Sequence, residues 1–160
     1  MTTKAEAALK VFESYLGEEE GVGDWFAIDQ ARINMFADAT MDHQFIHIDP
    51  ERSAELSPYK VTIAHGFLTL SLIVHLTSTI EPKNPKALDG VYMGVNYGLD
   101  KVRFPAPVPV DSRIHARQKL VAADLKNANT IQLKREVTVE IEGSSKPVCI
   151  AETLMRMMYS

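Results

Sequence analysis

The 160-residue sequence predicts an α+β fold in which helices come first and strands follow. Three observations carry this prediction. Apolar residues recur at helical spacing near the start of the chain. One apolar stretch, 66–80, contains no Asp, Glu, Lys or Arg. From residue 91 onward apolar and polar residues alternate, which is typical of antiparallel strands that are covered on one face.

A helix over about 4–16 is expected to open the chain. Thr3 and Glu6 form a capping box ahead of an apolar helical pattern, and Gly17 is a suitable end. A short strand is then expected over 24–28, where aromatic and β-branched residues gather.

Two further helices are expected before the apolar stretch. Asp29 can cap a helix that runs to about Ala39. Asp49 can cap another, with Pro50 in its first turn and an end before Pro58. The segment between these two helices has no clear pattern.

The stretch 66–80 is predicted to be a helix buried on all sides, because only small hydroxyl groups and one histidine interrupt its apolar residues. At 1.5 Å per residue it would be about 22 Å long. Such a helix can be buried all round only if a curved sheet wraps it, which is the hotdog arrangement. The strands of that sheet are expected over 91–104, with a bulge near Asp100, and over 114–122, 131–141 and 149–159.

Composition limits the function classes. The length fits one domain spanning 1–160, and the net charge of −4 argues against general nucleic-acid binding. Cys149 is the only cysteine and cannot form an internal disulfide. The charged N-terminal segment does not resemble a signal peptide, so a cytoplasmic location is expected. No run of 18 apolar residues exists, so no membrane span is expected.

The densest group of titratable residues surrounds Asp42 and His47. Taken singly, each could be a solvated or capping residue. Together, around an irregular turn, a carboxylate and an imidazole can point at one spot and hold one water molecule. With a histidine pKa near about 6.5 and a partly buried carboxyl, the pair can move protons both ways near neutral pH. This chemistry suits the addition or loss of water.

A metal site is the weaker alternative. His43 and His47 would face one way on a helix, and Asp42 could add a third ligand. The spacing differs from His-Glu-x-x-His, and the intervening residues disfavour a helix. No metal is therefore expected. No cofactor is expected either, because the addition of water is redox-neutral and the acid–base pair can move the protons.

Gly66 stands where the predicted buried helix begins. The first N–H groups of a helix lack internal partners and lie at the positive end of its dipole. Because a glycine lets a ligand come close, a carbonyl oxygen that gains negative charge could be stabilised there. A plain turn glycine is the alternative.

Three segments resemble, in order, the MaoC-like dehydratase family, which includes R-specific enoyl-CoA hydratases. They are residues 36–52, 63–72 and 96–109. The Asp-His-Gln form at 42–44 and the third segment are most similar to the nodulation-protein-N-like branch. The resemblance implies a homodimeric hotdog protein that acts on acyl thioesters of CoA.

The resemblance also implies roles for single residues. The family's motif Asp-x-Asn-Pro-x-His-x-Asp begins here at Asp42, so its catalytic pair carries over to Asp42 and His47. Gln44 replaces the Asn of that motif and is expected beside the substrate. Gly66 carries over as the oxyanion donor. His65 of the same motif is expected to have a structural or orienting role among the substrate-binding residues.

The activity implied is hydration of trans-2-enoyl-CoA to (3R)-3-hydroxyacyl-CoA and the reverse dehydration. A thioesterase and a non-catalytic acyl-thioester binder are the alternatives. The phosphates of CoA require local positive charge, for which Lys101 and Arg103 are the expected contacts, with Arg113 and Arg117 as further candidates.

Overall fold

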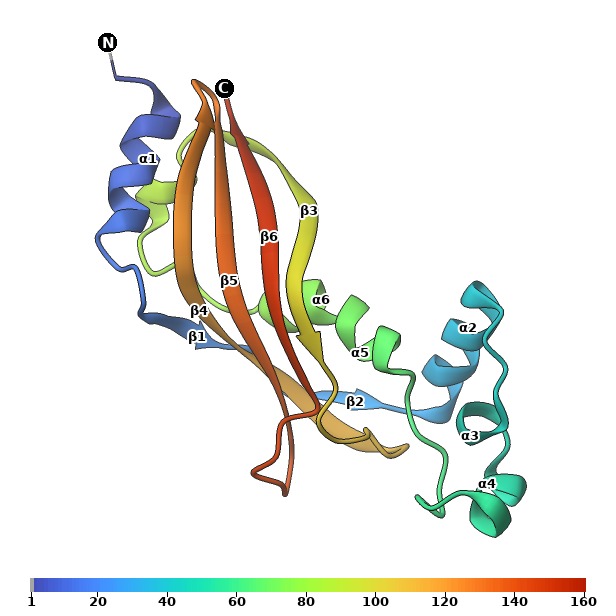
Figure 1. Ribbon diagram of the computed structural model, residues 1–160. Helices are drawn as coiled ribbons and strands as arrows, with labels where there is room; N and C mark the ends of the chain where they lie inside the picture. The colour runs from blue at the N-terminus through green and yellow to red at the C-terminus, as the bar shows by residue number, and fades with distance from the viewer. Residues whose placement is uncertain (1) are drawn as a thin grey trace.

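The computed structural model describes residues 2–160. Its strands form one antiparallel sheet in the order β1-β4-β5-β6-β3, with β2 also paired to β4 (Figure 1). Because β3 lies at one edge and β1 and β2 at the other, the sheet is not closed into a barrel. The strands are β1 (Glu19–Val22), β2 (Phe26–Ile28), β3 (Val91–Arg103), β4 (Ser112–Asn127), β5 (Thr130–Ile141) and β6 (Cys149–Tyr159).

The helices are short and form three groups by contact. A 3-10 helix, η1, packs beside α1, and α2 to α4 form an arm that extends away from the sheet (Figure 1). The helices are α1 (Lys4–Glu13), α2 (Gln30–Thr40), α3 (Phe45–Ile48), α4 (Pro50–Leu56), α5 (Gly66–Ser71), α6 (Ile73–Thr77) and η1 (Pro85–Leu88).

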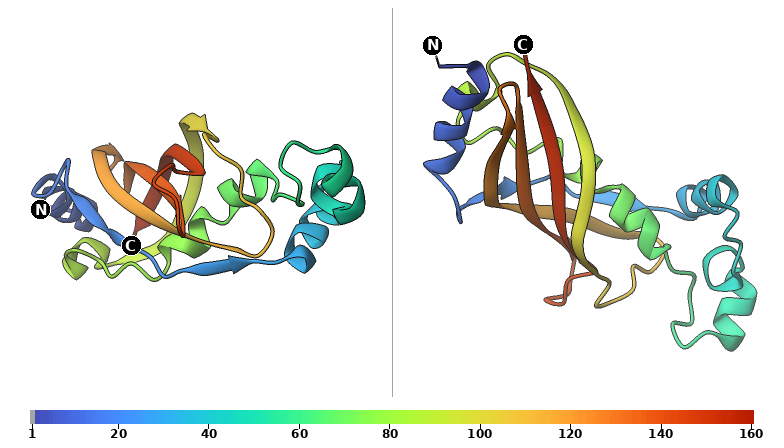
Figure 2. Two further views of the ribbon diagram at one scale, coloured as in Figure 1. Left: turned by 90° about the horizontal axis from the view of Figure 1, so that it is seen from below. Right: turned by 45° about the horizontal axis from the view of Figure 1, so that its top comes forward.

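Helices cover one face of the curved sheet in two places (Figure 2). The pair α5 and α6 packs against β4 and β6, and α1 packs across β4, β5 and β6 at the other end. Each contact buries its own apolar cluster, one around Leu76 and Ile114 and the other around Phe12 and Leu133. This arrangement confirms the predicted α+β hotdog fold.

Most predicted elements are confirmed. The capping box of Thr3 and Glu6 starts α1, although the helix ends at Glu13 rather than at residue 16. Asp29 and Asp49 cap α2 and α4 through their carboxylates. The four long strands lie where the alternation predicts them, and the register of β3 against β6 shifts between residues 99 and 102, near the predicted bulge. Strand β1 was not predicted, because its Glu19-Glu20-Gly21-Val22 sequence shows no apolar alternation.

The predicted long helix over 66–80 is wrong in two respects. The segment forms α5 and α6, which are interrupted at Leu72, and it ends at Thr77. Hydroxyl groups of the segment bond to carbonyls three or four residues earlier, including Thr77 to Ile73, and so compete with the helical pattern. The helix pair is also not buried all round, because Phe67 is 68% exposed and Val74 is 57% exposed. Only one face of the pair meets the sheet.

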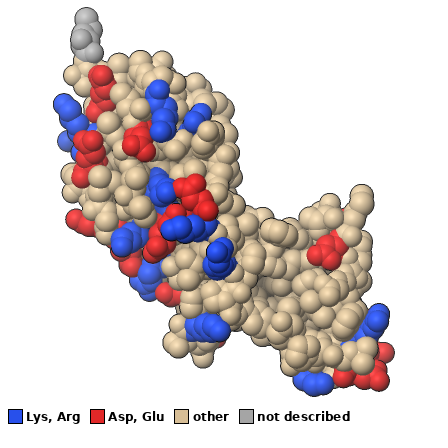
Figure 3. Space-filling model, viewed as in Figure 1, with Lys and Arg blue, Asp and Glu red and all other residues tan. Residues whose placement is uncertain are grey.

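The outer face of the sheet carries interleaved positive and negative side chains (Figure 3). They pair across strands, as in the bonds of Arg117 to Glu140 and of Arg113 to Glu142, both at 3.0 Å. Within residues 2–160, no helix is both long and apolar enough to cross a membrane.

Candidate active site

The site lies where the arm meets the start of α5. Its central residue is His47 of α3, whose side chain is buried at 7% exposure. The Nδ1–H of His47 donates to the main-chain carbonyl of Ile63 at 2.7 Å. This bond fixes the tautomer of the neutral ring, because a carbonyl can only accept, and leaves Nε2 with its lone pair available.

Burial lowers the pKa of His47, and a neighbouring imidazole, His65, lowers it further. The hydrogen bond to Ile63 and the carboxylate of Asp42 act in the opposite direction. The net effect is a downward shift, so His47 is neutral at neutral pH and able to accept a proton.

Asp42 lies in the loop that follows α2. This helix ends at Thr40, and its C-cap, Met41, has a φ of 62° that places it in the left-handed region and reverses the chain direction. The Asp42 side chain is half exposed, and its Oδ1 accepts a long hydrogen bond of 3.4 Å from the N–H of Gln44. One nitrogen each of His47 and His65 and one carboxylate oxygen of Asp42 all lie within 4.8 Å of one another.

A cavity of about 280 Å³ opens beside this cluster. His47 and Gly66 both line it, with Thr69 of α5 on the same wall. A Cβ on Gly66 would lie 3.1 Å from the ring of Phe104, so this position has little room for any other residue. The predicted partners, an imidazole and the start of a helix, therefore share one cavity, and Asp42 stands within 4.8 Å of that imidazole without lining the cavity itself.

None of the other predicted site residues lines this cavity. His65 is 2% exposed and does not line the cavity, whereas Gln44 is exposed and precedes α3 without a side-chain capping bond. Lys101 lies 3.6 Å from Glu152. Arg103, at the end of β3, has no carboxylate within 4 Å among the described residues, and its Nη1 donates to the carbonyl of its own neighbour in the chain.

The predicted metal alternative is not assembled as the sequence suggested. His43 pairs with Asp38 at 2.8 Å instead of joining His47. His65 is the third residue close enough to share an ion with Asp42 and His47. Its Nε2–H, however, donates to the main-chain carbonyl of Asp42 at 2.9 Å, so a metal could bind this nitrogen only after that bond is broken.

The sequence does not reveal the aromatic walls of the cavity or one main-chain contact of the site. Tyr59 and Phe104 line the cavity from two loops, and the carbonyl of Ile63 orients His47. A main-chain carbonyl carries no signal in a sequence, and single aromatic residues in loops resemble any others.

Known proteins resemble this chain both in sequence and in fold. The family model described as "MaoC like domain" matches residues 11–142. The chain is 49% identical over 140 residues to 3-hydroxyacyl-thioester dehydratase Z of Mycobacterium tuberculosis, covering 88% of this chain and 89% of that protein. It is 47% identical over 146 residues to nodulation protein N of Rhizobium meliloti, covering 91% and 88%.

Among solved structures, the R-hydratase PhaJ1 from Pseudomonas aeruginosa superposes with a TM-score of 0.68 at 20% identity, covering 99% of this chain and 87% of that one. A MaoC-like dehydratase from Rhodospirillum rubrum gives 0.70 at 16% identity, covering 91% and 93%. These two similarities concern the fold. With the family match and the close relatives, they lead to one conclusion: the chain belongs to the MaoC-like domain family, in its nodulation-protein-N-like branch.

Proposed function

We propose that this protein catalyses the reversible hydration of trans-2-enoyl thioesters to (3R)-3-hydroxyacyl thioesters. One observation carries the proposal: a neutral, buried His47 with a free Nε2 stands within 4.8 Å of the Asp42 carboxylate and on a cavity that reaches Gly66. The name of the Mycobacterium tuberculosis relative, 3-hydroxyacyl-thioester dehydratase Z, supports the same reaction class.

The proposed mechanism uses the two side chains on one water molecule. The carbonyl oxygen of the enoyl thioester accepts a hydrogen bond from the N–H of Gly66. Oxygen of the water forms a bond to C3 while one member of the Asp42–His47 pair takes its proton. The C2–C3 π electrons move toward the carbonyl, and a proton returned by the pair adds to C2. Because the enolate-like charge develops only in the transition state, a hydrogen-bond donor at the carbonyl helps there most.

The direct test is the hydration of crotonyl-CoA, followed by the loss of ultraviolet absorbance of the enoyl thioester. Chiral analysis of the product should give the (3R)-hydroxy thioester. Release of free thiol, detected with a thiol reagent, would indicate a thioesterase instead. Binding of crotonyl-CoA without either reaction would indicate a non-catalytic binder.

The acyl carrier brings phosphate groups, and Arg103 is the proposed contact. It lies one residue before Phe104, which lines the cavity, and it has no carboxylate partner among the described residues. Lys101, two residues earlier, lies 3.6 Å from Glu152, which also pairs with Lys134. We expect Arg103→Ala to raise KM for crotonyl-CoA severalfold with little change in kcat, because the contact acts alike in ground and transition states.

The matched control for Arg103→Ala is Lys101→Ala, which removes a cation from the same strand. A smaller KM change is expected there. Equal effects of the two substitutions, or no effect of either, would contradict a specific role of Arg103.

The pH dependence of the reaction should report the lowered pKa of His47. If the neutral imidazole takes part, kcat/KM should begin to decrease only at a pH below about 6.5, the ordinary pKa of histidine. The same shift should make unfolding easier as the pH falls below the unfolded value, because the unfolded chain then binds a proton that the folded site resists. A rate profile over pH 4–8 checks the first expectation. An acidic limb above the ordinary value would contradict it.

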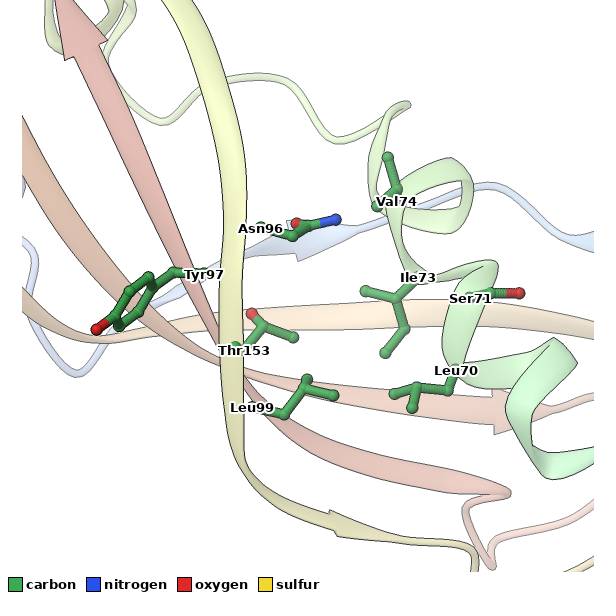
Figure 4. A pocket seen from close by; sticks show the side chains of 9 residues that line it. Leu70, Ser71, Ile73, Val74, Asn96, Tyr97, Leu99 and Thr153 are labelled. Carbon is green, nitrogen blue, oxygen red and sulfur yellow. The ribbon is translucent and has the colours of Figure 1, made fainter.

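A homodimer is proposed to complete the apolar surface around α5 and α6. A groove of about 240 Å³ separates these helices from the edge strand β3 (Figure 4). Leu70 and Ile73 face it from the helices and Leu99 from the strand, while the Tyr97 side chain points away from the helices. Since β3 is a free edge and the outer helix face is exposed, a second copy joined at this edge would cover both.

The dimer proposal predicts a native mass of about twice 17.8 kDa in light scattering. We expect Val74→Glu to give monomers, because a carboxylate would be placed on the exposed helix face. Val121→Glu is the control, since it changes the same residue type, 40% exposed, on β4. A wild-type mass of one chain, or a Val74→Glu protein that stays dimeric, would contradict this interface.

A further inference from the structure

His65 occupies a place that its predicted role as a substrate contact does not explain. It is 2% exposed and does not line the cavity. Its main-chain carbonyl accepts the N–H groups of Leu68 and Thr69 and so begins α5, while its side chain turns toward the loop that holds Asp42. One residue thus touches both parts of the proposed site.

The first contact of the side chain fixes the Asp42 loop. The Nε2–H of His65 donates to the main-chain carbonyl of Asp42 at 2.9 Å, directly after the chain reversal at Met41. The Asp42 carboxylate has only one hydrogen bond of its own among the described residues, the long one from Gln44. Its position therefore depends on where the main chain is held.

The second contact supports the proposed acid–base residue. The rings of His65 and His47 stack with centroids 3.8 Å apart and an interplanar angle of 22°. The ring of Phe36 packs against His65 at 4.9 Å. The hydrogen bond from Nδ1 to Ile63 already restrains the His47 ring. The stacked His65 ring restricts the rotation that is left, which would otherwise turn Nε2 of His47 away from the cavity.

The remaining nitrogen of His65 indicates that packing alone did not select this residue. Its Nδ1 is buried and is the one buried side-chain polar atom without a hydrogen-bond partner in the described chain. Buried polar atoms are normally paired, so an imidazole is a poor choice for filling space. Phenylalanine would fill the same space without leaving a nitrogen unpaired.

We infer that His65 is a positioning residue that joins the Asp42 loop, the His47 ring and the start of α5 through one Nε2–H bond and one ring stack. This inference rests on the proposed function for its kinetic test and on the geometry alone for its spectroscopic test. His65 acts through Asp42 and His47 and does not contact the substrate.

Two variants separate the two contacts. His65→Phe keeps an aromatic ring against His47 but removes the donor to Asp42, whereas His65→Asn keeps an N–H donor and removes the stack. We expect His65→Phe to lower kcat for crotonyl-CoA by up to about 10²-fold, the scale for a misplaced reacting group, with KM changed less than about twofold. His65→Asn should recover part of kcat. His75→Phe, on α6 and against Phe26, is the matched control and should retain the wild-type kcat.

Nuclear magnetic resonance tests the inference without any reaction. In His65→Phe, the amide signals of Asp42 and His43 should broaden or shift, and the ring signals of His47 should shift because its stacking partner has changed. If wild-type protein does not hydrate crotonyl-CoA while these spectral changes occur, the proposed function fails and the positioning role stands.

The inference would be overturned by a folded His65→Phe protein with wild-type kcat, or by unchanged Asp42 and His47 signals. A change in KM alone would indicate a substrate contact and would also overturn it. If His65→Phe does not fold, His65→Asn carries the same measurements, with loss of the stack as the expected cause of any effect.

Discussion

Replacing Asp42 or His47 with Ala is expected to lower kcat for crotonyl-CoA by about 10²–10⁴-fold, the usual contribution of a general acid or base. Both side chains are proposed to hold the same water molecule, so neither can position it alone. The Asp42 carboxylate and a nitrogen of His47 lie within 4.8 Å of each other, close enough for one water to contact both. Residual activity should come from the Gly66 N–H and from substrate binding.

Conservative variants separate this loss of chemistry from a loss of structure. His47→Ala also leaves the Ile63 carbonyl without its donor, whereas His47→Asn places an amide N–H near the position of Nδ1. Asp42→Asn keeps shape and removes charge. Circular dichroism should show folded protein in all of these variants, and the double variant should be about as slow as the slower single one, because the pair acts as a unit. Full activity in Asp42→Ala or His47→Ala would refute the assignment.

The second large effect is expected at the buried ion pair of Glu20 and Arg135. Their side chains are 7% and 15% exposed and are joined at 2.7 and 3.1 Å, while Gln118 donates to the same carboxylate at 2.8 Å. Replacing Glu20 with Ala should lower the free energy of unfolding by about 1–3 kcal/mol, because it leaves the guanidinium of Arg135, only 15% exposed, without its carboxylate partner. Urea unfolding followed by circular dichroism measures this change.

A neighbouring ion pair provides the control. Glu19, next in the same strand, bonds to Arg117, but these side chains are 47% and 41% exposed. Glu19→Ala should cost at most about 1 kcal/mol, because solvent screens the pair. Replacing both Glu20 and Arg135 with apolar residues should restore much of the lost stability. Similar losses for Glu20→Ala and Glu19→Ala would contradict the distinction.

The pair of Glu20 and Arg135 also shows what the alternation of apolar and polar residues cannot predict. Arg135 lies on the covered face of β5, between Leu133 of one apolar cluster and Val137 of the other. Alternation marks such a position as inward-facing, but it cannot supply the partner. That partner is Glu20 of β1, a strand without an apolar pattern, which lies 115 residues away along the chain.

The sequence likewise predicts only part of the proposed catalytic site. The aspartate, the histidine and the glycine of the proposed site are visible in the sequence, and the family resemblance points to Asp42, His47 and Gly66. The sequence does not reveal that His65 carries the Asp42 loop, because the bond joins a side chain to a main-chain carbonyl. Nor does it reveal that Lys101 lies near the carboxylate of Glu152, whereas Arg103 has no carboxylate within 4 Å among the described residues, because both lie on the same strand.

By itself, the sequence determined the local elements: the capping box of α1, the caps of α2 and α4, the alternating strands and the bulge in β3. These depend on neighbours within a few residues, so a linear pattern records them. Tertiary structure alone decided that the pair α5 and α6 keeps one exposed face, that Glu20 meets Arg135 on the covered face of the sheet, and that His65 joins the halves of the site. Each of these depends on contacts between segments that are far apart in the sequence. A linear pattern does not specify such contacts, because the partners include main-chain carbonyls and free sheet edges, which every sequence provides.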